Sequence, residues 1–458
     1  MGQPRVIVVG AGPAGTRCAE ALVAAGIRPT LIDEGRRNGG QIYRRQPENF
    51  VRSYATLYGT EAVAAEALHR DFDALAQKIE YLPETLIWNI AAGNVHAVRE
   101  GREITLPFDA LILCTGATDR IMPIKGWQFV GAFSLGGAQV ALKSQACAIG
   151  RRVVFTGSGA LLYLVASQYA KAGAGVAAVV DTSPWSLRLS ALPGLLAQPS
   201  VLWKGVKLDL ALRFAGVPIY HGATPLEIEG TPDAGVRALR FRDTNRRTHR
   251  VDCDAVAMGH HLRSETQLAD IAHCAFEFDA RTRQWLVKID DDGRASVSGI
   301  YLAGDGARIR GARAAELSGR LAALAALQDL GHAASPNEMR DARQSLARWS
   351  RFAQGLSAAF PWPHDHAAQL PDDAIVCRCE AVKAGELRGA VHEKGAQEAN
   401  RAKAFSRVGM GRCQGRYCGQ AAAEIIAAAA NIPVETVGRL RSQAPVKPLP
   451  VNIAGEAE

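Results

Sequence analysis

The sequence predicts an α/β protein that contains two Rossmann-like βαβ units and ends in a small helical module rich in cysteine. The two units, at 5–34 and 152–181, each combine an apolar strand, a glycine turn and a segment with helical spacing. Further strand-and-turn segments follow at 108–117, 253–261 and 298–307. Four of the nine cysteines then gather near the end of the chain. Strands that alternate with helices are typical of α/β folds with parallel sheets.

Composition narrows the class of protein. The length of 458 residues allows two to three domains, and 48% hydrophobic with 21% charged residues is typical of globular proteins. No window of eighteen uninterrupted apolar residues predicts a transmembrane span. The N-terminal segment lacks the basic and apolar regions of a signal peptide, so we expect a cytoplasmic protein with reduced thiols. Grouped cysteines then indicate metal binding or catalysis more than disulfides.

The net charge of +8 comes partly from basic runs such as "RFRDTNRRTHR" at 240–250. Basic runs can mark nucleic-acid surfaces, but this run has no interleaved aromatic residues and the chain has no recognisable binding module. We therefore interpret it as a solvated hairpin face and expect no nucleic-acid partner.

The first βαβ unit predicts a dinucleotide site. "RVIVVG" (5–10) has the continuous apolar pattern of a parallel strand, and "GAGPAG" follows it. In this motif the first glycine makes the turn, the second admits a pyrophosphate and the third packs helix on strand. An acidic pair at the end of the second strand can accept hydrogen bonds from ribose hydroxyls. A plain packing turn is the weaker alternative. The expected contacts are Gly10, Gly12, Pro13, Ala14, Gly15, Asp33 and Glu34.

The second unit is less complete. "GSGALL" supplies Gly157 and Gly159, but Leu162 stands where a third small residue is expected. No arginine cluster follows Asp181 at the end of the next strand, so a partner for a 2′-phosphate is not evident. An active NAD(P) site, a vestigial site and a site for another adenine nucleotide all remain open.

Three further motifs resemble the two-dinucleotide-binding-domain flavoproteins, the class of thioredoxin reductase and ferredoxin reductase relatives. They are "GGQIYR" (39–44), "DALILCTGA" (109–117) and "GIYLAGDGA" (299–307). The resemblance implies FAD at the first glycine turn and NAD(P)H at the second. It implies that Gly304 and Asp305 contact the flavin's phosphate and ribityl region. It further implies that Gly39, Gly40 and Gln41 pass beside the isoalloxazine and that Thr115 and Gly116 mark the crossing between domains.

No Cys-x-x-Cys redox pair lies near these motifs. The remaining cysteines are expected to be small buried hydrophobic residues rather than redox partners. They are Cys18, Cys114, Cys147, Cys253 and Cys274. The flavin must therefore exchange electrons with another group.

The last four cysteines form a C-x-C pair, Cys377 and Cys379, and a C-x₄-C pair, Cys413 and Cys418. A [2Fe–2S] cluster needs four thiolates, and two close pairs on loops can bind it from opposite sides. Structural zinc, usually bound by C-x₂₋₄-C pairs, fits the spacing poorly, and an empty or reactive-thiol site is the third alternative. Nearby glycines can turn amide groups toward sulfur. The arrangement resembles the helical [2Fe–2S] domain named after bacterioferritin-associated ferredoxin (BFD), with every ligand position filled.

The whole chain resembles the A (α) subunits of heteromeric FAD-dependent amino-acid and opine dehydrogenases, through "IDEGRRNGGQIYR" and "AFSRVGMGRCQGRYCG". Members act on octopine and nopaline, D-hydroxyproline, proline, or glycine in hydrogen cyanide synthase. The resemblance implies a partner β subunit of the D-amino-acid-oxidase type, itself a flavoprotein, that oxidises the C–N bond. It extends to a small γ subunit, an FMN between subunits, membrane association through a partner, and a one-electron acceptor or the respiratory chain.

The sequence therefore predicts an electron-relay subunit. No acid/base dyad stands out, and we interpret His260 and His261 as a loop pair at a subunit or nucleotide surface. Alternatives are a self-contained NAD(P)H-dependent reductase and an assembly protein with a structural flavin. The expected domains are an FAD domain (1–118 and 291–332), an NAD(P)-binding-like domain (119–290), a short helix and linker (333–372), a [2Fe–2S] domain (373–430) and an extended or disordered tail (431–458).

Overall fold

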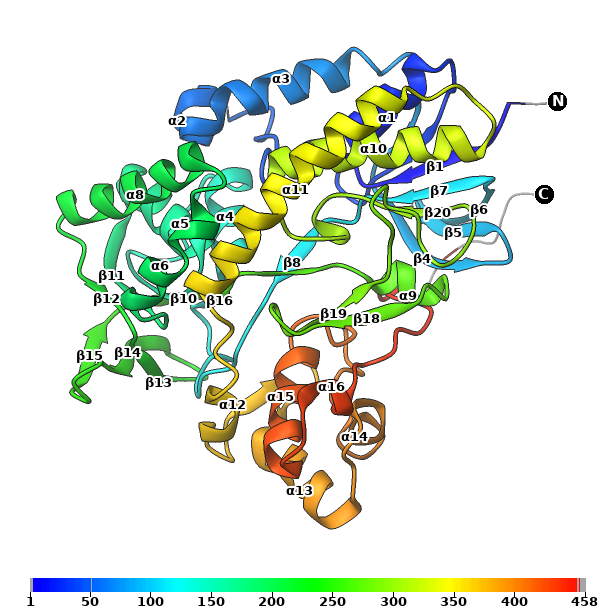
Figure 1. Cartoon of the computed structure of the whole chain (residues 1–458). Coiled ribbons are helices and arrows are strands. Elements are labelled where there is room, and N and C mark those ends of the chain that lie inside the picture. The colour runs from blue at the N-terminus through cyan, green and yellow to red at the C-terminus, as the bar shows by residue number, and fades with distance from the viewer. Residues whose placement is uncertain (1–2, 51, 451–452, 454–458) are drawn as a thin grey trace.

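The computed structural model describes residues 3–50, 52–450 and 453. Two parallel sheets and a separate helical module make up the molecule (Figure 1). The α/β architecture predicted from the two βαβ patterns is confirmed. In the part of the chain that the structure describes, no helix has both the length and the apolar character needed to cross a bilayer.

The first sheet has five parallel strands in the order β20-β7-β1-β2-β3. Its central strand β1 is buried at every position, which explains the unbroken apolar run in the sequence. One face is covered by helices α1 and α10, and the other by the antiparallel strands β4, β5 and β6. The bounds are β1 (Val6–Val9), α1 (Pro13–Ala24), β2 (Thr30–Ile32), β3 (Glu80–Leu82), β4 (Thr85–Ala91), β5 (Asn94–Arg99), β6 (Arg102–Pro107), β7 (Ala110–Leu113), β20 (Ile300–Leu302) and α10 (Ala312–Asp329).

The second sheet repeats this pattern, with parallel strands in the order β12-β11-β10-β16-β9. Helices α4 and α5 pack on it, and the antiparallel strands β13, β14 and β15 form a further layer. The basic run at 240–250 lies in the β14–β15 hairpin, where Arg240 and Arg250 pair with Glu227 and Glu229 across the strands. The bounds are β9 (Ala132–Ser134), α4 (Leu135–Ser144), β10 (Arg152–Ser158), α5 (Ala160–Lys171), β11 (Gly175–Asp181), β12 (Ile219–Tyr220), β13 (Thr224–Thr231), β14 (Gly235–Arg242), β15 (Thr248–Asp252) and β16 (Ala255–His260).

Two short strands connect the sheets. The chain leaves the first sheet through β8 (Ala117–Asp119) and returns through β17 (Leu262–Ser264), and the two strands pair antiparallel. Ten further short and long segments complete the two sheet-containing parts. They are α2 (Tyr54–Tyr58), η1 (Gly59–Glu61), α3 (Ala62–Asp73), α6 (Trp185–Ser190), α7 (Leu192–Leu195), α8 (Pro199–Phe214), α9 (Gln267–Ile271), β18 (Phe276–Asp279), β19 (Gln284–Val287) and the 3-10 turn η2 (Gly304–Gly306).

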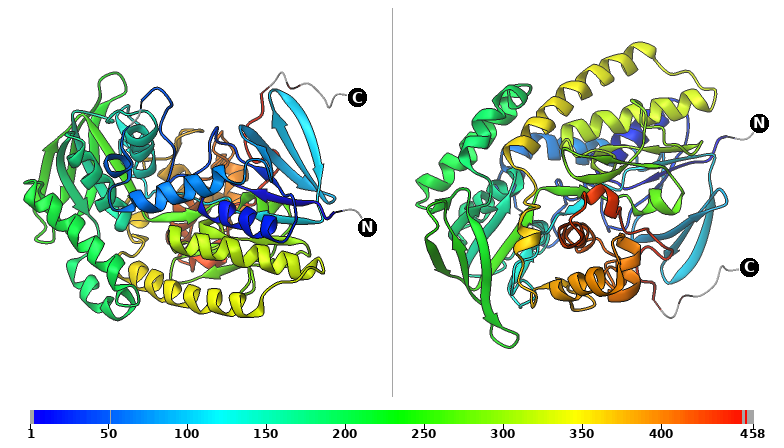
Figure 2. Two further views of the ribbon diagram at one scale, coloured as in Figure 1. Left: turned by 90° about the horizontal axis from the view of Figure 1, so that it is seen from above. Right: turned by 60° about the horizontal axis from the view of Figure 1, so that its bottom comes forward.

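The cysteine module lies beside both sheets, as the two views of Figure 2 show in orange and red. Helix α16 packs against α15, and residues 438–450 return from the module to the first sheet, where Val446 is buried in its core. Residues 438–450 form no helix or strand, whereas α16 lies inside the range 431–458 that was expected to be an extended or disordered tail. The bounds are α12 (His366–Gln369), β21 (Ile375–Cys377), β22 (Val382–Lys383), α13 (Ala384–Lys394), α14 (Ala399–Ser406), α15 (Gly419–Ala430) and α16 (Val434–Val437).

Helix α11 (Pro336–Ala359) is much longer than the short helix expected from the sequence. Ser335 caps its N-terminus by accepting the amide of Glu338, and Pro336 occupies the first turn. The helix packs against α10 at one part of its length and against α6 and α7 at another, so its polar sequence is still stabilised by tertiary contacts (Figure 1). Helix propensity and hydrophobic periodicity do not report such tertiary contacts, so they could not predict the length of this helix.

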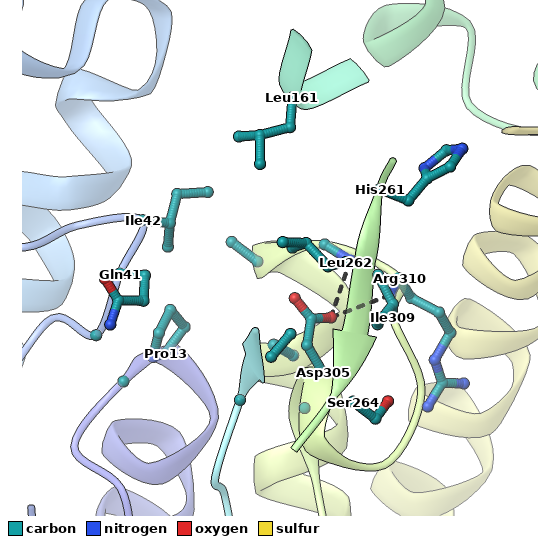
Figure 3. Close-up of a pocket in the computed structure, with 18 of the residues that line it drawn as sticks. Pro13, Gln41, Ile42, Leu161, His261, Leu262, Ser264, Asp305, Ile309 and Arg310 are labelled. Atoms are coloured by element: carbon teal, nitrogen blue, oxygen red, sulfur yellow. Dashed lines mark hydrogen bonds between the residues drawn. The ribbon is translucent and has the colours of Figure 1, made fainter. Parts of the chain in front are cut away.

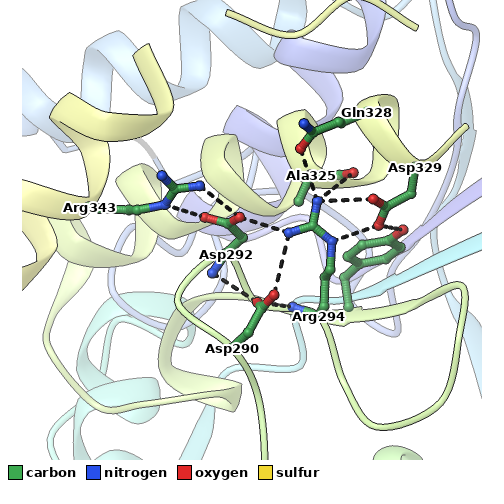
Figure 4. Close-up of polar contacts among 8 residues, drawn as sticks. Asp290, Asp292, Arg294, Ala325, Gln328, Asp329 and Arg343 are labelled. Atoms are coloured by element: carbon green, nitrogen blue, oxygen red, sulfur yellow. Dashed lines mark hydrogen bonds and ion pairs between the residues drawn. The ribbon is translucent and has the colours of Figure 1, made fainter. Parts of the chain in front are cut away.

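An ion network fastens α11 to the first sheet (Figure 4). Asp292 accepts hydrogen bonds from Arg343 of α11 at 2.6 and 2.9 Å and from Arg294 at 2.7 Å. Arg294 also donates to Asp329 at the end of α10, at 2.7 Å. Because the Asp292 side chain is only 9% exposed, solvent screens these contacts less than ordinary surface pairs.

Asp292→Asn is expected to lower the free energy of local unfolding of α11 by about 1–2 kcal/mol, since the two arginines lose the charged acceptor that they share. Amide hydrogen exchange within 336–359 measures the effect. Asp291→Asn is the matched control, because Asp291 is exposed and forms no hydrogen bond or ion pair here. Equal protection of α11 in both variants would contradict the network's role.

The same network predicts a pH dependence. Burial raises the pKa of Asp292, but the hydrogen bonds from Arg343 and Arg294 outweigh it, so the folded-state pKa is lowered. A lowered pKa gives stability that is present above the unfolded value of about 3.9 and is lost as the pH falls through the folded value. The difference in exchange between the parent and Asp292→Asn should therefore shrink in acid below about pH 4.

Candidate functional site

A cavity of about 3080 Å³, called the central cavity below, lies between the two sheets and the cysteine module. Twelve of the fifteen residues expected to bind a nucleotide cofactor line it. They are Gly10, Gly12, Pro13, Ala14, Asp33, Glu34, Gly40, Gln41, Thr115, Gly116, Gly304 and Asp305. Figure 3 shows Pro13 and Gln41 across the cavity from Asp305 and Arg310, with Leu161 on α5 and His261 directly after β16. Gly15, Gly157 and Gly159 are not among the lining residues.

The three glycines of the first turn differ in what requires them. A Cβ on Gly15 would lie 1.7 Å from the Gly10 carbonyl oxygen, and one on Gly10 would lie 2.4 Å from that of Cys114. These two positions are needed for the fold itself. A Cβ on Gly12 would meet protein no closer than 3.6 Å, and its φ of −78° suits any residue. Gly12 therefore matters for what enters the cavity.

The turn presents free donors to the cavity. Gly12 is the N-cap of α1 and offers no side-chain acceptor to the first amide groups, while Pro13 lacks an amide of its own. Unpaired N–H groups and the helix dipole together favour an anion at this end of the helix. The arrangement fits the pyrophosphate of a dinucleotide.

Asp33 lines the cavity and also stabilises the glycine turn through hydrogen bonds. Its carboxylate accepts the amides of Ala11 at 2.5 Å and Gly35 at 2.6 Å. Burial raises the pKa of Asp33, and these two hydrogen bonds oppose that rise. The neighbouring Glu34 forms an ion pair with Lys447 of the C-terminal segment. Asp33 thus has fewer free lone pairs for a ribose than the sequence motif alone suggested.

The late Gly-Asp motif lies against the first turn. A Cβ on Gly304 would come within 2.9 Å of Ala14, and the Gly304 amide donates to Ser318 at 2.8 Å. Asp305 accepts the amides of Arg310 at 3.0 Å and Gly311 at 3.3 Å. Burial raises the pKa of Asp305, and these hydrogen bonds counter it. The motif therefore meets the cavity with an oriented, half-buried carboxyl group.

Sequence inspection missed two buried cations near the cavity. Arg310 projects from the segment after the Gly-Asp motif, donates to Ser350 at 3.2 Å, and has a pKa lowered to about 10 by burial. Lys143, on α4, donates to the Ile42 carbonyl at 3.0 Å, and burial lowers its pKa to about 8. The "RIR" run at 308–310 was a weak signal for the first, whereas nothing local marks the second.

The second glycine turn is structured differently. The side chain of Leu162 is fully buried in the core of this sheet, so a larger residue is accommodated where a third glycine is usual. Asp181 has no exposed surface and accepts Tyr163 and Arg188, each at 2.6 Å, together with the Ser183 amide at 2.8 Å. Its carboxylate is thus fully engaged by neighbours in this unit.

The two adjacent histidines depart from the expected surface pair. His260 ends β16 and is buried, with its Nδ1 3.1 Å from the Ser158 hydroxyl, and burial lowers its pKa well below the usual value. His261 does line the cavity, and its Nε2 lies 2.7 Å from the Phe360 carbonyl. Burial lowers the pKa of His261 to about 4. The interpretation of His260 as a loop residue was wrong, because β16 continues one residue further into the core.

The four clustered thiols lie close together. Cys418 contacts Cys377 and Cys413, and Cys413 contacts Cys379. The contact with Cys418 lowers the pKa of Cys377 to about 6 and that of Cys413 to about 5, against the effect of burial. Contacts with Cys377 and Cys413 raise the pKa of Cys418, and burial raises that of Cys379.

Backbone amides also point at these sulfurs. The amide of Gly409 faces Cys377, and those of Gly415 and Tyr417 face Cys413. Gly409 and Gly415 both have φ near +80°, where side chains are strained. The expected role of the glycines in turning donors toward sulfur agrees with this geometry.

The described residues hold no group of three His, Cys, Asp or Glu side chains that converge as ligands of one metal ion. The thiols instead contact one another in pairs along the series 377, 418, 413 and 379. In a [2Fe–2S] centre two thiolates bind each of two irons, so its ligands need not surround a single point. The residues fit that group.

The other cysteines are free thiols, and four of the five are buried as expected. Cys147 is exposed and so departs from the expectation of a buried hydrophobic residue. It follows α4 in a loop, where the apolar pattern of the helix has already ended.

The chain matches known families over most of its length. Residues 4–319 match the pyridine nucleotide-disulphide oxidoreductase family, and residues 375–428 match the BFD-like [2Fe-2S] binding domain. The first match implies FAD and the second a [2Fe–2S] centre.

Named relatives extend the comparison to the full chain. The A subunit of opine oxidase from Rhizobium meliloti is 34% identical over 97% of this chain and 86% of its own length. Hydrogen cyanide synthase subunit HcnB of Pseudomonas aeruginosa is 30% identical over 98% of this chain and 97% of its own length. Both are subunits of larger enzymes by name.

Solved structures share the fold. L-proline dehydrogenase from P. horikoshii superposes with a TM-score of 0.69 at 20% identity, over 99% of this chain and 79% of its own. Thioredoxin reductase from T. acidophilum gives 0.53 at 20% identity, over 72% and 99% respectively. With the sequence matches, these likenesses show that the chain belongs to the pyridine nucleotide-disulphide oxidoreductase family and, within it, to the family of HcnB and the opine oxidase A subunits.

Proposed function

We propose that the chain is the electron-relay subunit of a heteromeric dehydrogenase that oxidises the C–N bond of an amino acid or opine. The observation that carries this proposal is that the glycine turn and the loop of residues 413–418 line the same cavity. Arg416 and Tyr417, which directly precede the cluster cysteine Cys418, line the same cavity as the first glycine turn. A two-electron flavin and a one-electron centre would thus be neighbours. The names of the full-length relatives support the substrate class.

In this proposal the chain's own residues bind and orient the cofactors. The amides at the start of α1 hold the pyrophosphate, while Asp33 keeps the turn in shape and Asp305 faces the ribityl side. Lys143 fixes the segment after Gln41 from the opposite sheet. Cys377, Cys379, Cys413 and Cys418 hold the cluster. When bound, FAD can accept two electrons and release them one at a time, and a [2Fe–2S] centre carries one electron at a time.

Substrate oxidation is assigned to a partner. The histidine that lines the central cavity, His261, is neutral at physiological pH because burial lowers its pKa to about 4, and its Nε2 lies 2.7 Å from the Phe360 carbonyl. We therefore propose a flavoprotein β subunit of the D-amino-acid-oxidase type as the electron donor. FMN at the interface, a one-electron or respiratory acceptor and a γ subunit belong to the same proposal, as does the domain division at 118, 290, 332, 372 and 430.

The second nucleotide unit is proposed not to serve NAD(P)H. A nicotinamide dinucleotide would need the carboxylate of Asp181 for its ribose, and Arg188 and Tyr163 already occupy it. The guanidinium of Arg188 also stacks between Trp185 and Phe360, at 4.6 and 5.0 Å from their ring centres. Opening the site would break both sets of contacts.

NADH and NADPH are accordingly expected to leave the flavin of the isolated chain oxidised. Anaerobic mixing followed by flavin absorbance measures this, and dithionite serves as the positive control for a reducible flavin. Reduction within seconds by either nucleotide would favour the self-contained reductase over the relay subunit.

Gly12→Val is expected to remove FAD without unfolding the chain. The added Cβ would meet protein no closer than 3.6 Å, yet the side chain would occupy the space of the pyrophosphate. Flavin released by denaturation should fall about tenfold or more, with far-UV circular dichroism unchanged. Gly15→Ala is the comparison, because its Cβ collides with the Gly10 carbonyl and should disturb fold and flavin together. Full flavin content in Gly12→Val would refute the site.

Cys413→Ser is expected to lose most iron and acid-labile sulfide, because an oxygen ligand suits iron–sulfur chemistry poorly. FAD should stay bound, since the first sheet has its own core. Cys147→Ser, at the exposed cysteine outside the cluster, should keep both iron and sulfide. Zinc in the parent protein, or unchanged iron in the variant, would contradict the cluster assignment.

A further inference from the structure

The loop of residues 413–418, called the cluster loop here, belongs to two sites at once. It carries two of the four cluster cysteines, and two of its side chains line the central cavity. Its position therefore decides how the cluster sits relative to whatever fills that cavity. The contacts that fix this loop come from elements far away in the sequence.

Arg416 is the centre of those contacts. Its Nε donates to the carboxylate of Glu265 at 2.9 Å, and its Nη1 donates to the carbonyls of Cys413 at 3.3 Å and Val446 at 2.9 Å. The side chains of Arg416 and Glu265 are only 10% and 12% exposed. One guanidinium thus joins a cluster ligand, the crossing between the sheets and the C-terminal segment.

Glu265 connects this ion pair to the proposed flavin motif. Its amide donates to the Gly116 carbonyl at 3.0 Å, and its own carbonyl accepts the Thr115 hydroxyl at 2.6 Å. Thr115 and Gly116 both line the central cavity. A continuous series of hydrogen bonds therefore leads from Thr115 through Glu265 and Arg416 to Cys413.

The crossing supports the loop at two further points. Arg263 donates to the Arg416 carbonyl at 2.9 Å, and Gln267 donates to the Gln414 carbonyl at 2.7 Å. From the other side, Val446 is buried in the first core and its amide donates to the Trp88 carbonyl at 3.2 Å. Loss of Arg416 alone would leave these backbone contacts, so the loop should remain folded.

We propose that Arg416 is a positioning residue for electron transfer: it holds the cluster loop against the flavin side of the central cavity and raises the reduction potential of the cluster with its positive charge. This inference rests on the proposed relay function. An added electron makes a thiolate-ligated cluster more negative, so a nearby buried cation favours the reduced state. A planar guanidinium can serve three acceptors in fixed directions, which an ammonium cannot do equally well.

Arg416→Gln tests the proposal, with Arg407→Gln as the matched control. Arg407 also neutralises a carboxylate of the cysteine module, Glu380 at 2.8 Å, but it is 66% exposed and does not line the cavity. Arg416→Gln should keep its iron, lower the cluster's reduction potential in a redox titration, and slow transfer from reduced flavin to cluster about tenfold. Arg407→Gln should resemble the parent in all three.

Arg416→Lys separates charge from geometry. Lysine keeps the charge, so the potential should return close to the parent value, while the slow transfer should persist. Equal potentials and rates in the parent and Arg416→Gln, or equal effects of Arg407→Gln, would overturn the inference. Loss of iron in both Arg416 variants would also overturn it, because it would show a role in folding only. A parent protein without a cluster signal would instead contradict the proposed function.

Discussion

Two paired strands of three residues each, β8 and β17, carry the chain from one sheet to the other and back. Their backbone pairing sets the distance between the sheets and thereby the width of the central cavity. It also places Thr115 next to Glu265, although 150 residues separate them. The glycine turn, the late Gly-Asp motif and the cluster loop each approach the cavity from a different element. The position of each relative to the others depends on this one crossing.

Buried and half-buried arginines account for part of the basic composition. Arg120 lies 3.9 Å from the Trp362 ring centre and donates to Gln420 near the start of α15, while Arg283 pairs with Glu424 in the middle of the same helix. Together with Arg263 and Arg416 they contribute to the contact between the module and the rest of the chain. Part of the +8 net charge is therefore used in the interior, where a cation needs a partner, instead of on an open surface.

The fold and the C-terminal domain could be predicted because their signatures are local. Glycine turns, apolar strands and cysteine spacing depend on residues close in the chain, and they indicated the α/β fold and the BFD-like domain that the family matches show. Asp181 and His260 were harder, because their partners Arg188 and Ser158 come from other elements. Arg416 gave no signal, since its partner Glu265 lies 151 residues away. The length of α11 was missed because packing, not periodicity, supports its polar sequence.

The order of strands has a consequence for biosynthesis. All strands of the second sheet lie between residues 132 and 260, whereas the first sheet needs β20 at 300–302 and is covered by α10 only after residue 312. Because domains form as the ribosome delivers them, the inserted sheet can complete itself while its host still lacks an edge strand. The glycine turn at 10–15 is thus among the first motifs to be translated, but its cover, α10, follows about 300 residues later. A nascent chain would hold this turn open until α10 has been translated, which places flavin insertion after that point of synthesis.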